Sequence, residues 1–339
     1  MKNLRTTKIA GLFLSIGFAC LLSSCDKNDS EISQPQSIVE VPVALGVTLK
    51  ESRLTFETID AFKQYRKSID KKSSKELMEK DKAIGLDSHL ADIAVTLGNT
   101  KGSRVSEEVA QKVEKRVRDP YFASMLNKNR ELQIGNTIYR CNADYVFEYQ
   151  KGEEKSIDDF YNQAKSSKMN IPDHKAVDFK DIKVAQTDVK IQKITSKINN
   201  PNARVAYNCT VNYSQDNSYR MGGEYFTEWY FFFTTAGVST QMEHERGWWI
   251  FKGWYDEDAD YVSVAAYQVG LYYNGIQGNY DISYQNQFRE NYNDDVATCI
   301  FDWFVGIPFV GQYVWQSGIV TSKAIFRGET LECQFFIQP

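Results

Sequence analysis

The sequence predicts an α+β protein in which a helical N-terminal region precedes an aromatic-rich antiparallel β-sandwich. Apolar residues recur at helical spacing between residues 54 and 126. Beyond residue 203, apolar and polar residues alternate along several segments, as they do in strands with one buried face. Of the 46 Phe, Trp and Tyr residues, 32 lie in residues 201–339, including all six Trp. Two compositions in one chain indicate two folds.

Residues 1–24 have the pattern of a signal peptide. A basic start precedes an apolar run over residues 9–22 that is shorter than the roughly 20 apolar residues needed to span a membrane. The run ends in Leu22-Ser23-Ser24-Cys25, which resembles the lipobox of bacterial lipoproteins. The resemblance implies cleavage before Cys25 and acyl chains on its thiol. The alternative is an ordinary signal peptide that happens to contain this cysteine.

Residues 25–48 are interpreted as a lipidated tether. One acyl chain anchors a protein only marginally, whereas the two or more chains of a lipobox cysteine hold it stably. The polar stretch 26–31 is similar to the short acidic signal that sends lipoproteins of Bacteroidota to the cell surface. We therefore expect an outer-membrane lipoprotein of the cell envelope, with the periplasmic and surface-facing sides both open.

Residues 49–167 are predicted to be a helical region with a small β-hairpin. Thr58 is a plausible N-cap for a helix from Ile59, and Asp119-Pro120 is a typical helix start. Another helix is expected from Ser106, whereas residues 70–104 are rich in Lys, Ser and Gly and are expected to be mobile.

The hairpin is predicted around Gly135-Asn136, and a further strand from Tyr145. A capping box at Ser156 predicts a short helix over 160–165, and residues 168–202 form the expected linker.

Residues 203–339 are predicted to form the sandwich domain, because short alternating segments are separated by Gly, Asn and Asp. Residues 296–315 are apolar but broken by Gly and Pro, and are interpreted as a cover over one sheet. The expected strands are 205–213, 227–234, 248–255, 261–267, 318–326 and 331–337.

Residues 119–127, which lead into 134–139, resemble uncharacterised cell-envelope lipoproteins of Bacteroidota. Those proteins share a lipobox, a helical front part and a β-rich end. The likeness covers about residues 50–165 and implies a lipoprotein of unknown function. It assigns no site residues.

The formal net charge of −4 argues against nucleic acid as a partner, which normally requires a basic patch. The charge is unevenly distributed. Residues 201–339 hold 7 Lys/Arg and 16 Asp/Glu, a net of −9, so residues 1–200 carry +5. The expected partners are the membrane, through the lipid anchor, and a glycan or an envelope protein.

The cysteines permit a disulfide in an oxidising compartment. Beyond the lipidated residue there are four, which allow three complete pairings: Cys141, Cys209, Cys299 and Cys333. Cys209 and Cys333 both lie on the apolar face of their strands and are the natural candidates. The alternative is that each cysteine is a small buried hydrophobic residue.

No metal site is predicted. Asp256, Asp258 and Asp260 match the opening of a calcium loop, but Tyr261 and Tyr267 stand where that loop needs Gly and a closing Glu. An acidic turn between strands explains these residues better.

No catalytic residue or cofactor is predicted either, and the chain is not expected to be an enzyme. On a strand, Glu243 and Glu245 would share one face and His244 the other, which is not a general acid–base arrangement. The sequence contains no nucleophile elbow, phosphate loop or zinc-protease motif.

Aromatic residues fall on both faces of the expected strand 248–255, where a sheet with one solvated face should alternate. Either something covers the second face or that face binds a ligand, since aromatic platforms stack well on sugar rings. The candidate platform is Trp248, Trp249, Trp254 and Tyr255. The preferred function is a non-enzymatic binding module; the alternatives are a structural or assembly lipoprotein without a small ligand and, third, an envelope hydrolase.

Overall fold

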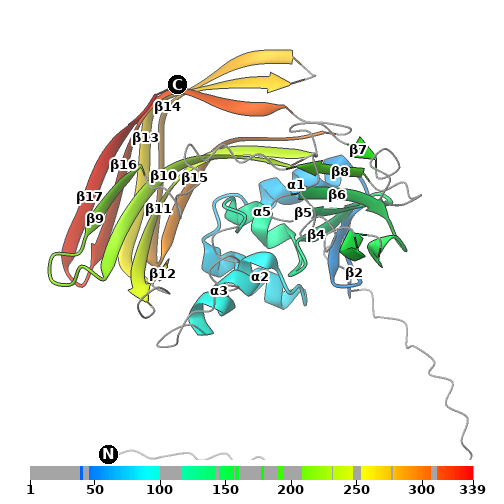
Figure 1. Ribbon diagram of the computed structural model, residues 1–339, viewed down its shortest axis with the longest axis horizontal. Coiled ribbons are helices and arrows are strands. Elements are labelled where there is room, and N and C mark those ends of the chain that lie inside the picture. The colour runs from blue at the N-terminus through cyan, green and yellow to red at the C-terminus, as the bar shows by residue number, and fades with distance from the viewer. Residues whose placement is uncertain are drawn as a thin grey trace, which may run out of the picture. The chain divides into compact units, whose positions relative to one another are not determined.

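The computed structural model describes residues 39–40, 46–99, 116–141, 145–155, 157–159, 177–178, 190–193, 208–230, 232–246, 253–275, 278–306 and 311–338. This part of the chain is mostly β, in three sheets whose strands pair almost entirely antiparallel (Figure 1). The antiparallel β-structure is as predicted. The predicted signal peptide and the predicted helices from Ser106 and over 160–165 lie outside the described residues. Within the described ranges, no helix is long and apolar enough to cross a membrane.

The N-terminal region contains more β-structure than predicted. Its eight-stranded sheet, here called the front sheet, has the order β1-β2-β3-β4-β5-β6-β8-β7. The predicted hairpin at Gly135 is confirmed as β4–β5, and Gly135 has a φ of 59°, which a residue without a Cβ adopts easily. The strands are Val39–Glu40, Val47–Lys50, Arg53–Phe56, Glu131–Ile134, Thr137–Cys141, Tyr145–Gln150, Val177–Asp178 and Lys190–Lys193, β1 to β8 in chain order.

Two predicted helix starts are confirmed by their caps. Helix α1 (Ile59–Ile69) begins after Thr58, whose hydroxyl accepts a hydrogen bond from the Ala61 amide at 3.1 Å. Helix α5 (Pro120–Met125) begins after Asp119, whose carboxylate accepts from the amides of Tyr121 and Phe122. These side chains satisfy amide groups that a helix N-terminus otherwise leaves unpaired.

The segment expected to be mobile contains two helices, α2 (Ser74–Ala83) and α3 (His89–Asn99). Ser73 and Glu76 form a reciprocal capping box at the start of α2, and Leu77 is fully buried. Most of the other side chains of α2 are charged, so its apolar periodicity is too weak to be seen in the sequence. Capping and a single buried leucine compensate for that weakness.

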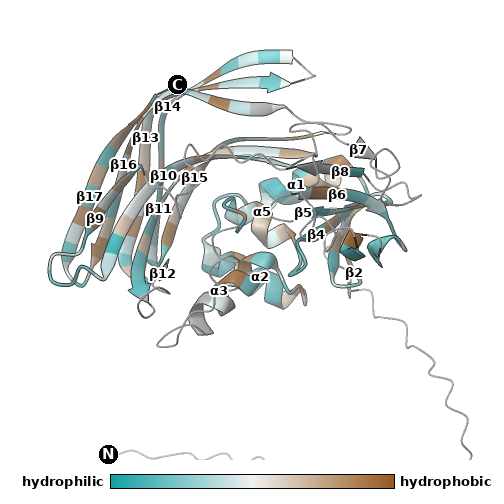
Figure 2. Cartoon of the chain, in the orientation of Figure 1, coloured by the Kyte–Doolittle hydropathy of each residue, from teal (hydrophilic) through white to brown (hydrophobic). Residues whose placement is uncertain are grey.

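The C-terminal region is built from two packed antiparallel sheets, in which hydrophobic and hydrophilic residues alternate along the strands (Figure 2). In the five-stranded sheet, β12-β11-β10-β9 lie in order and β15 also pairs with β11. The four-stranded sheet has the order β14-β13-β16-β17. The strands are Cys209–Asn212, Tyr219–Tyr230, Phe233–Arg246, Gly253–Asp256, Ala259–Gly275, Gly278–Asp294, Val296–Val305, Gln312–Phe326 and Glu329–Ile337, β9 to β17 in chain order.

The core between these sheets, here called the sandwich core, takes residues from both. Val238 of β11 and Ala297 of β15 pack in one cluster with Val264 of β13, Val320 of β16 and Phe335 of β17. Burial of such side chains contributes roughly 1.5–3 kcal/mol each.

The predicted strand 227–234 is wrong, because the chain reverses direction within it. Tyr230 pairs with Phe233 at the end of the β10–β11 hairpin. The aromatic residues at this turn are buried in a second cluster, here called the front core, which they share with α1, α5 and the front sheet. There the Phe233 ring stacks on that of Phe122 at 4.4 Å, and the Phe232 ring lies 4.1 Å from that of Tyr139.

The interpretation of residues 296–315 as a cover is also wrong. Val296–Val305 is strand β15 and pairs with β11, and Trp315 lies in β16. Neighbouring strands supply the backbone partners of this apolar segment, so it forms part of a sheet and does not lie over one. Strand β14 was not predicted, since its side chains are mostly polar and exposed.

We predict that Phe232→Ala lowers the free energy of unfolding by about 3–5 kcal/mol, as truncation of a fully buried phenylalanine does. Urea denaturation followed by circular dichroism and tryptophan fluorescence measures the change. Phe336→Ala, at an exposed ring, is the matched control and should change stability little. A loss below about 1 kcal/mol for Phe232→Ala would show that the hairpin turn does not belong to the front core.

Candidate functional site

The predicted aromatic platform is only partly described by the structure. Trp248 and Trp249 lie outside the described residues. Trp254 lies in β12, and the guanidinium carbon of Arg220 is 3.9 Å from the centre of its ring. Tyr255 pairs through its backbone with strand β11. One face of Trp254 is thus engaged by a cation of the same chain, and a platform made of all four residues stays a prediction.

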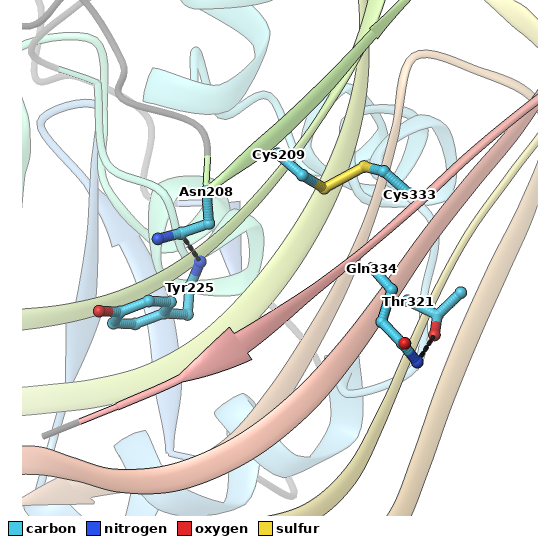
Figure 3. Close-up of a disulfide and its surroundings, with 6 residues drawn as sticks. All are labelled: Asn208, Cys209, Tyr225, Thr321, Cys333 and Gln334. Carbon is cyan, nitrogen blue, oxygen red and sulfur yellow. Dashed lines mark hydrogen bonds between the residues drawn. A yellow bond between two sulfur atoms is a disulfide. The ribbon is translucent and has the colours of Figure 1, made fainter.

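The structure joins Cys209 and Cys333 in a disulfide, with Cα atoms 6.3 Å apart (Figure 3). The bond connects β9, an edge of the five-stranded sheet, to β17, an edge of the four-stranded sheet. Cys141 and Cys299 are buried free thiols whose pKa values are raised by burial, so neither is a ready nucleophile. Cys25 lies outside the described residues.

Asp256, Asp258 and Asp260, which match the opening of a calcium loop, do not form a cluster that could hold an ion. Asp256 pairs with Arg116 at 3.6 Å, whereas Asp258 and Asp260 are exposed. In the part of the chain that the structure describes, no group of three His, Cys, Asp or Glu residues could hold a metal ion. The imidazole of His244 stacks on the Tyr219 ring at 4.0 Å, and Glu243 accepts a hydrogen bond from Arg220.

A different aromatic surface lies on the four-stranded sheet, on the side that faces away from the sandwich core. Val262, Val264 and Ala266 of β13 point inward and are buried. Because side chains alternate between the two faces of a strand, the residues between them point outward. The outward apolar residues of this sheet, here called the outer apolar face, are Tyr261, Tyr267, Phe288, Tyr292, Ile319, Ile325 and Phe336.

The strand register arranges this face in rows. Tyr292, Tyr261 and Ile325 lie opposite one another on three adjacent strands, and the two tyrosine rings are 5.1 Å apart in an edge-to-face contact. A second row contains Tyr267 and Ile319, with Phe336 as its third member. Six residues separate the two rows along β13, a distance of about 20 Å in a strand.

Polar residues fill the rows between. Ser263 of β13 lies opposite Glu290 of β14 and Lys323 of β16, and Lys323 lies opposite Glu332 of β17. Glu290 accepts a hydrogen bond from the Tyr261 hydroxyl at 3.1 Å.

In the next row Thr321 accepts a hydrogen bond from the Gln334 amide (Figure 3). Phe288 completes that row, opposite Ala265 of β13. Apolar and hydrogen-bonding groups therefore alternate every few ångströms across the face.

The face is exposed to solvent. Phe288, Tyr292 and Phe336 have exposed fractions of 59%, 64% and 63%. Several large apolar side chains left in water on one sheet face are typical of an interaction surface.

A β-bulge limits the face at one end. The register between β13 and β16 shifts after Tyr267, and Gln268 has a φ of 51°. Beyond the bulge the alternation is inverted, so Val269 and Leu271 point into the sandwich core. Bulges commonly re-aim side chains in this way. Tyr267 is the last outward residue of β13 before the bulge.

The fold and the outer apolar face define a β-rich protein with a solvated aromatic sheet surface. No family model and no curated protein matches the chain. A solved structure of a DUF4848 family protein from Bacteroides thetaiotaomicron VPI-5482 is similar over 86% of this chain and 100% of that chain, with 9% identity and a TM-score of 0.23. This likeness assigns no role to any residue of this chain.

A pattern in the sequence indicates the outer apolar face, although the predicted platform consists of other residues. Tyr261 and Tyr267 lie on the outward positions of a strand whose inward positions are also apolar. A strand with apolar side chains on both faces needs something that covers or binds each face, as the segment 248–255 does. The strand register that joins it to Phe288, Tyr292 and Phe336 cannot be read from the sequence.

We expect reduction of the disulfide to lower the free energy of unfolding by about 2–5 kcal/mol, since it closes a loop with a sequence separation of 124. Denaturation with and without dithiothreitol measures the difference. The double variant Cys209→Ser/Cys333→Ser should match the reduced protein and should not respond to the reductant. An unchanged midpoint for the reduced wild type would contradict the expectation.

Proposed function

We propose that this chain is a lipid-anchored protein of the cell envelope and a non-enzymatic binding module for glycans, with the outer apolar face as its binding surface. The observation that carries the proposal is the alternation of aromatic and hydrogen-bonding rows on one exposed sheet face. A sugar ring has an apolar face of C–H groups and a rim of hydroxyl groups. Aromatic rings match the C–H face of the sugar, and polar side chains match its hydroxyl groups.

The charged row favours a glycan over a protein partner. The centre of a protein–protein interface is depleted in charged residues. Here Glu290, Lys323 and Glu332 cross the middle of the face, between its two apolar rows. They keep the surface hydrated and supply donors and acceptors for hydroxyl groups, directly or through water.

The proposed address rests on the N-terminal sequence. The lipobox at Cys25 supports acylation, and the polar stretch after it supports the outer membrane. Because β1 begins at Val39, the tether is shorter than predicted, and residues 26–38 can span up to about 45 Å at about 3.3–3.6 Å per residue. A module held on such a tether could contact polysaccharide near the membrane.

We predict that the soluble domain, produced from residue 37 onward, binds one or more polysaccharides on a glycan array. The double variant Tyr292→Ala/Phe336→Ala should bind at least about fivefold more weakly, because each aromatic contact contributes about 0.5–1.5 kcal/mol. Its melting temperature should stay close to that of the wild type, since both rings are exposed. Isothermal titration calorimetry with the best array ligand measures the affinity.

Val95→Ala is the matched control, because Val95 is 60% exposed on helix α3, away from the sheet. Its affinity should equal that of the wild type. Equal binding by the aromatic double variant, or no glycan binding at all, would contradict the proposal. The alternative of a structural or assembly lipoprotein without a small ligand would then be preferred, and cleavage of an array glycan would favour a hydrolase.

Cys25→Ala should move the protein from the membrane fraction to the soluble envelope fraction or leave it unprocessed, because the acylated thiol is lost. Fractionation with immunoblotting, together with mass spectrometry of the N-terminus, provides the measurement. Ser24→Ala keeps a small residue before the cysteine and should remain membrane-bound. A processed Cys25→Ala protein that still fractionates with membranes would show that no lipid on this residue anchors it.

A further inference from the structure

A cavity of about 380 Å³ lies between helices α2 and α3 and the five-stranded sheet. This volume is in the range of small-molecule sites. The two sides of the cavity differ in chemistry. The helical side contributes the apolar residues Met78, Leu90, Ala94 and Val117. The strand side contributes polar residues, among them Ser239, Gln241, Asp256, Asp294 and Asp295.

Two arginines cross from the helical side to the strands. Arg118 pairs with Glu224, which also accepts a hydrogen bond from Ser239 at 3.1 Å. Arg116 pairs with Asp256 at 3.6 Å. In each pair the positive guanidinium group and the negative carboxylate offset each other's charge.

Two further acids, Asp294 and Asp295, lie beside the Arg116–Asp256 pair, and the side chain of Asp295 hydrogen-bonds with those of Asp256 and Asp294. Asp294 is the last residue of β14 and Asp295 precedes β15, and Asp294 is only 8% exposed. The Asp295 amide donates a hydrogen bond to the Asp294 carboxylate at 2.9 Å. Among the described residues, no ion pair joins either aspartate to a lysine or arginine.

The lining as a whole is negative. Three basic residues line the cavity, Lys75, Arg116 and Arg118, against five acidic ones, Glu224, Asp256, Asp258, Asp294 and Asp295, a formal balance of 3 − 5 = −2. Lys75 and Asp258 are exposed at the rim. The inner part of the cavity therefore combines an apolar wall with four carboxyl groups and two guanidinium groups.

We infer that this cavity binds a small organic amine, with its ammonium group on Asp294 and Asp295 and its apolar body against α2 and α3. The ammonium group adds a cation where carboxyl groups outnumber guanidinium groups, and its N–H groups donate to both carboxylates. The apolar body is removed from water against Met78 and Leu90. This site is separate from the outer apolar face, and the inference does not depend on the proposed glycan binding.

Binding of an amine is linked to proton release. Burial and the neighbouring Asp294 raise the pKa of Asp295 to about 8, although a hydrogen bond with Asp256 and the charge of Arg116 act in the opposite direction, so this carboxyl group holds a proton at neutral pH. An ammonium group placed between the two aspartates stabilises the ionised form and lowers that pKa. The complex should therefore release up to about one proton per amine bound at pH 7.

Phenethylamine is a suitable probe, and 2-phenylethanol is its neutral counterpart of nearly the same shape. Isothermal titration calorimetry at pH 7 should show saturable binding of the amine and at least tenfold weaker binding of the alcohol. Titration in phosphate and in Tris, which have different ionisation enthalpies, measures the released proton. Equal affinity for amine and alcohol, or no binding of the amine, would overturn the inference.

Asp294→Asn and Asp295→Asn should each weaken amine binding at least tenfold. Asp295→Asn keeps the shape of a carboxyl group that is already neutral, so this variant should fold, and circular dichroism checks that it does. Asp281→Asn, at an exposed carboxylate of β14 outside the cavity, is the matched control and should bind like the wild type. Unchanged affinity in both cavity variants, or binding without proton release, would remove the two aspartates from the site and overturn the inference.

Discussion

The aromatic turn of the β10–β11 hairpin packs in the front core, while the other end of the same hairpin forms the middle of the five-stranded sheet. Phe232 and Phe233 contact Phe62 and Phe122 of the helices, and farther along β11 Val238 lies in the sandwich core. A single pair of strands thus takes part in both cores. Removing the turn from the front core would expose large aromatic rings to water, so the two parts of the chain are held together by burial and not by a linker.

The sandwich core in turn fixes the surface from which function is proposed. Inward residues such as Val262 and Val264 determine which face of β13 is buried, and the outward positions of Tyr261 and Tyr267 follow from that choice. The Cys209–Cys333 disulfide joins the edge strands of the two sheets. Binding side chains on paired strands are held more rigidly than side chains on loops, which favours a preformed surface.

The outer apolar face and the amine cavity belong to opposite sides of the sandwich and use different chemistry. The face is open, with two apolar rows separated by a charged row and a mixed row, and suits an extended ligand. The cavity lies between the helices and the five-stranded sheet, with one apolar wall and more carboxyl groups than guanidinium groups. Strand β14 contributes to both, through Phe288 and Tyr292 on its outward side and through Asp294 at its end.

The sequence by itself determined the features that depend on a few neighbouring residues. The caps at Thr58 and Asp119, the turn at Gly135 and the inward positions of Cys209 and Cys333 were all readable from local patterns. The tertiary structure alone decided that residues 227–234 turn back, that 296–305 form a strand, and that a polar segment becomes β14. Burial and strand pairing depend on residues far apart in the chain, and one bulge at Gln268 exchanges the two faces of a strand. No local pattern contains that information, so the aromatic surplus was visible in the sequence, whereas the surface on which it lies was not.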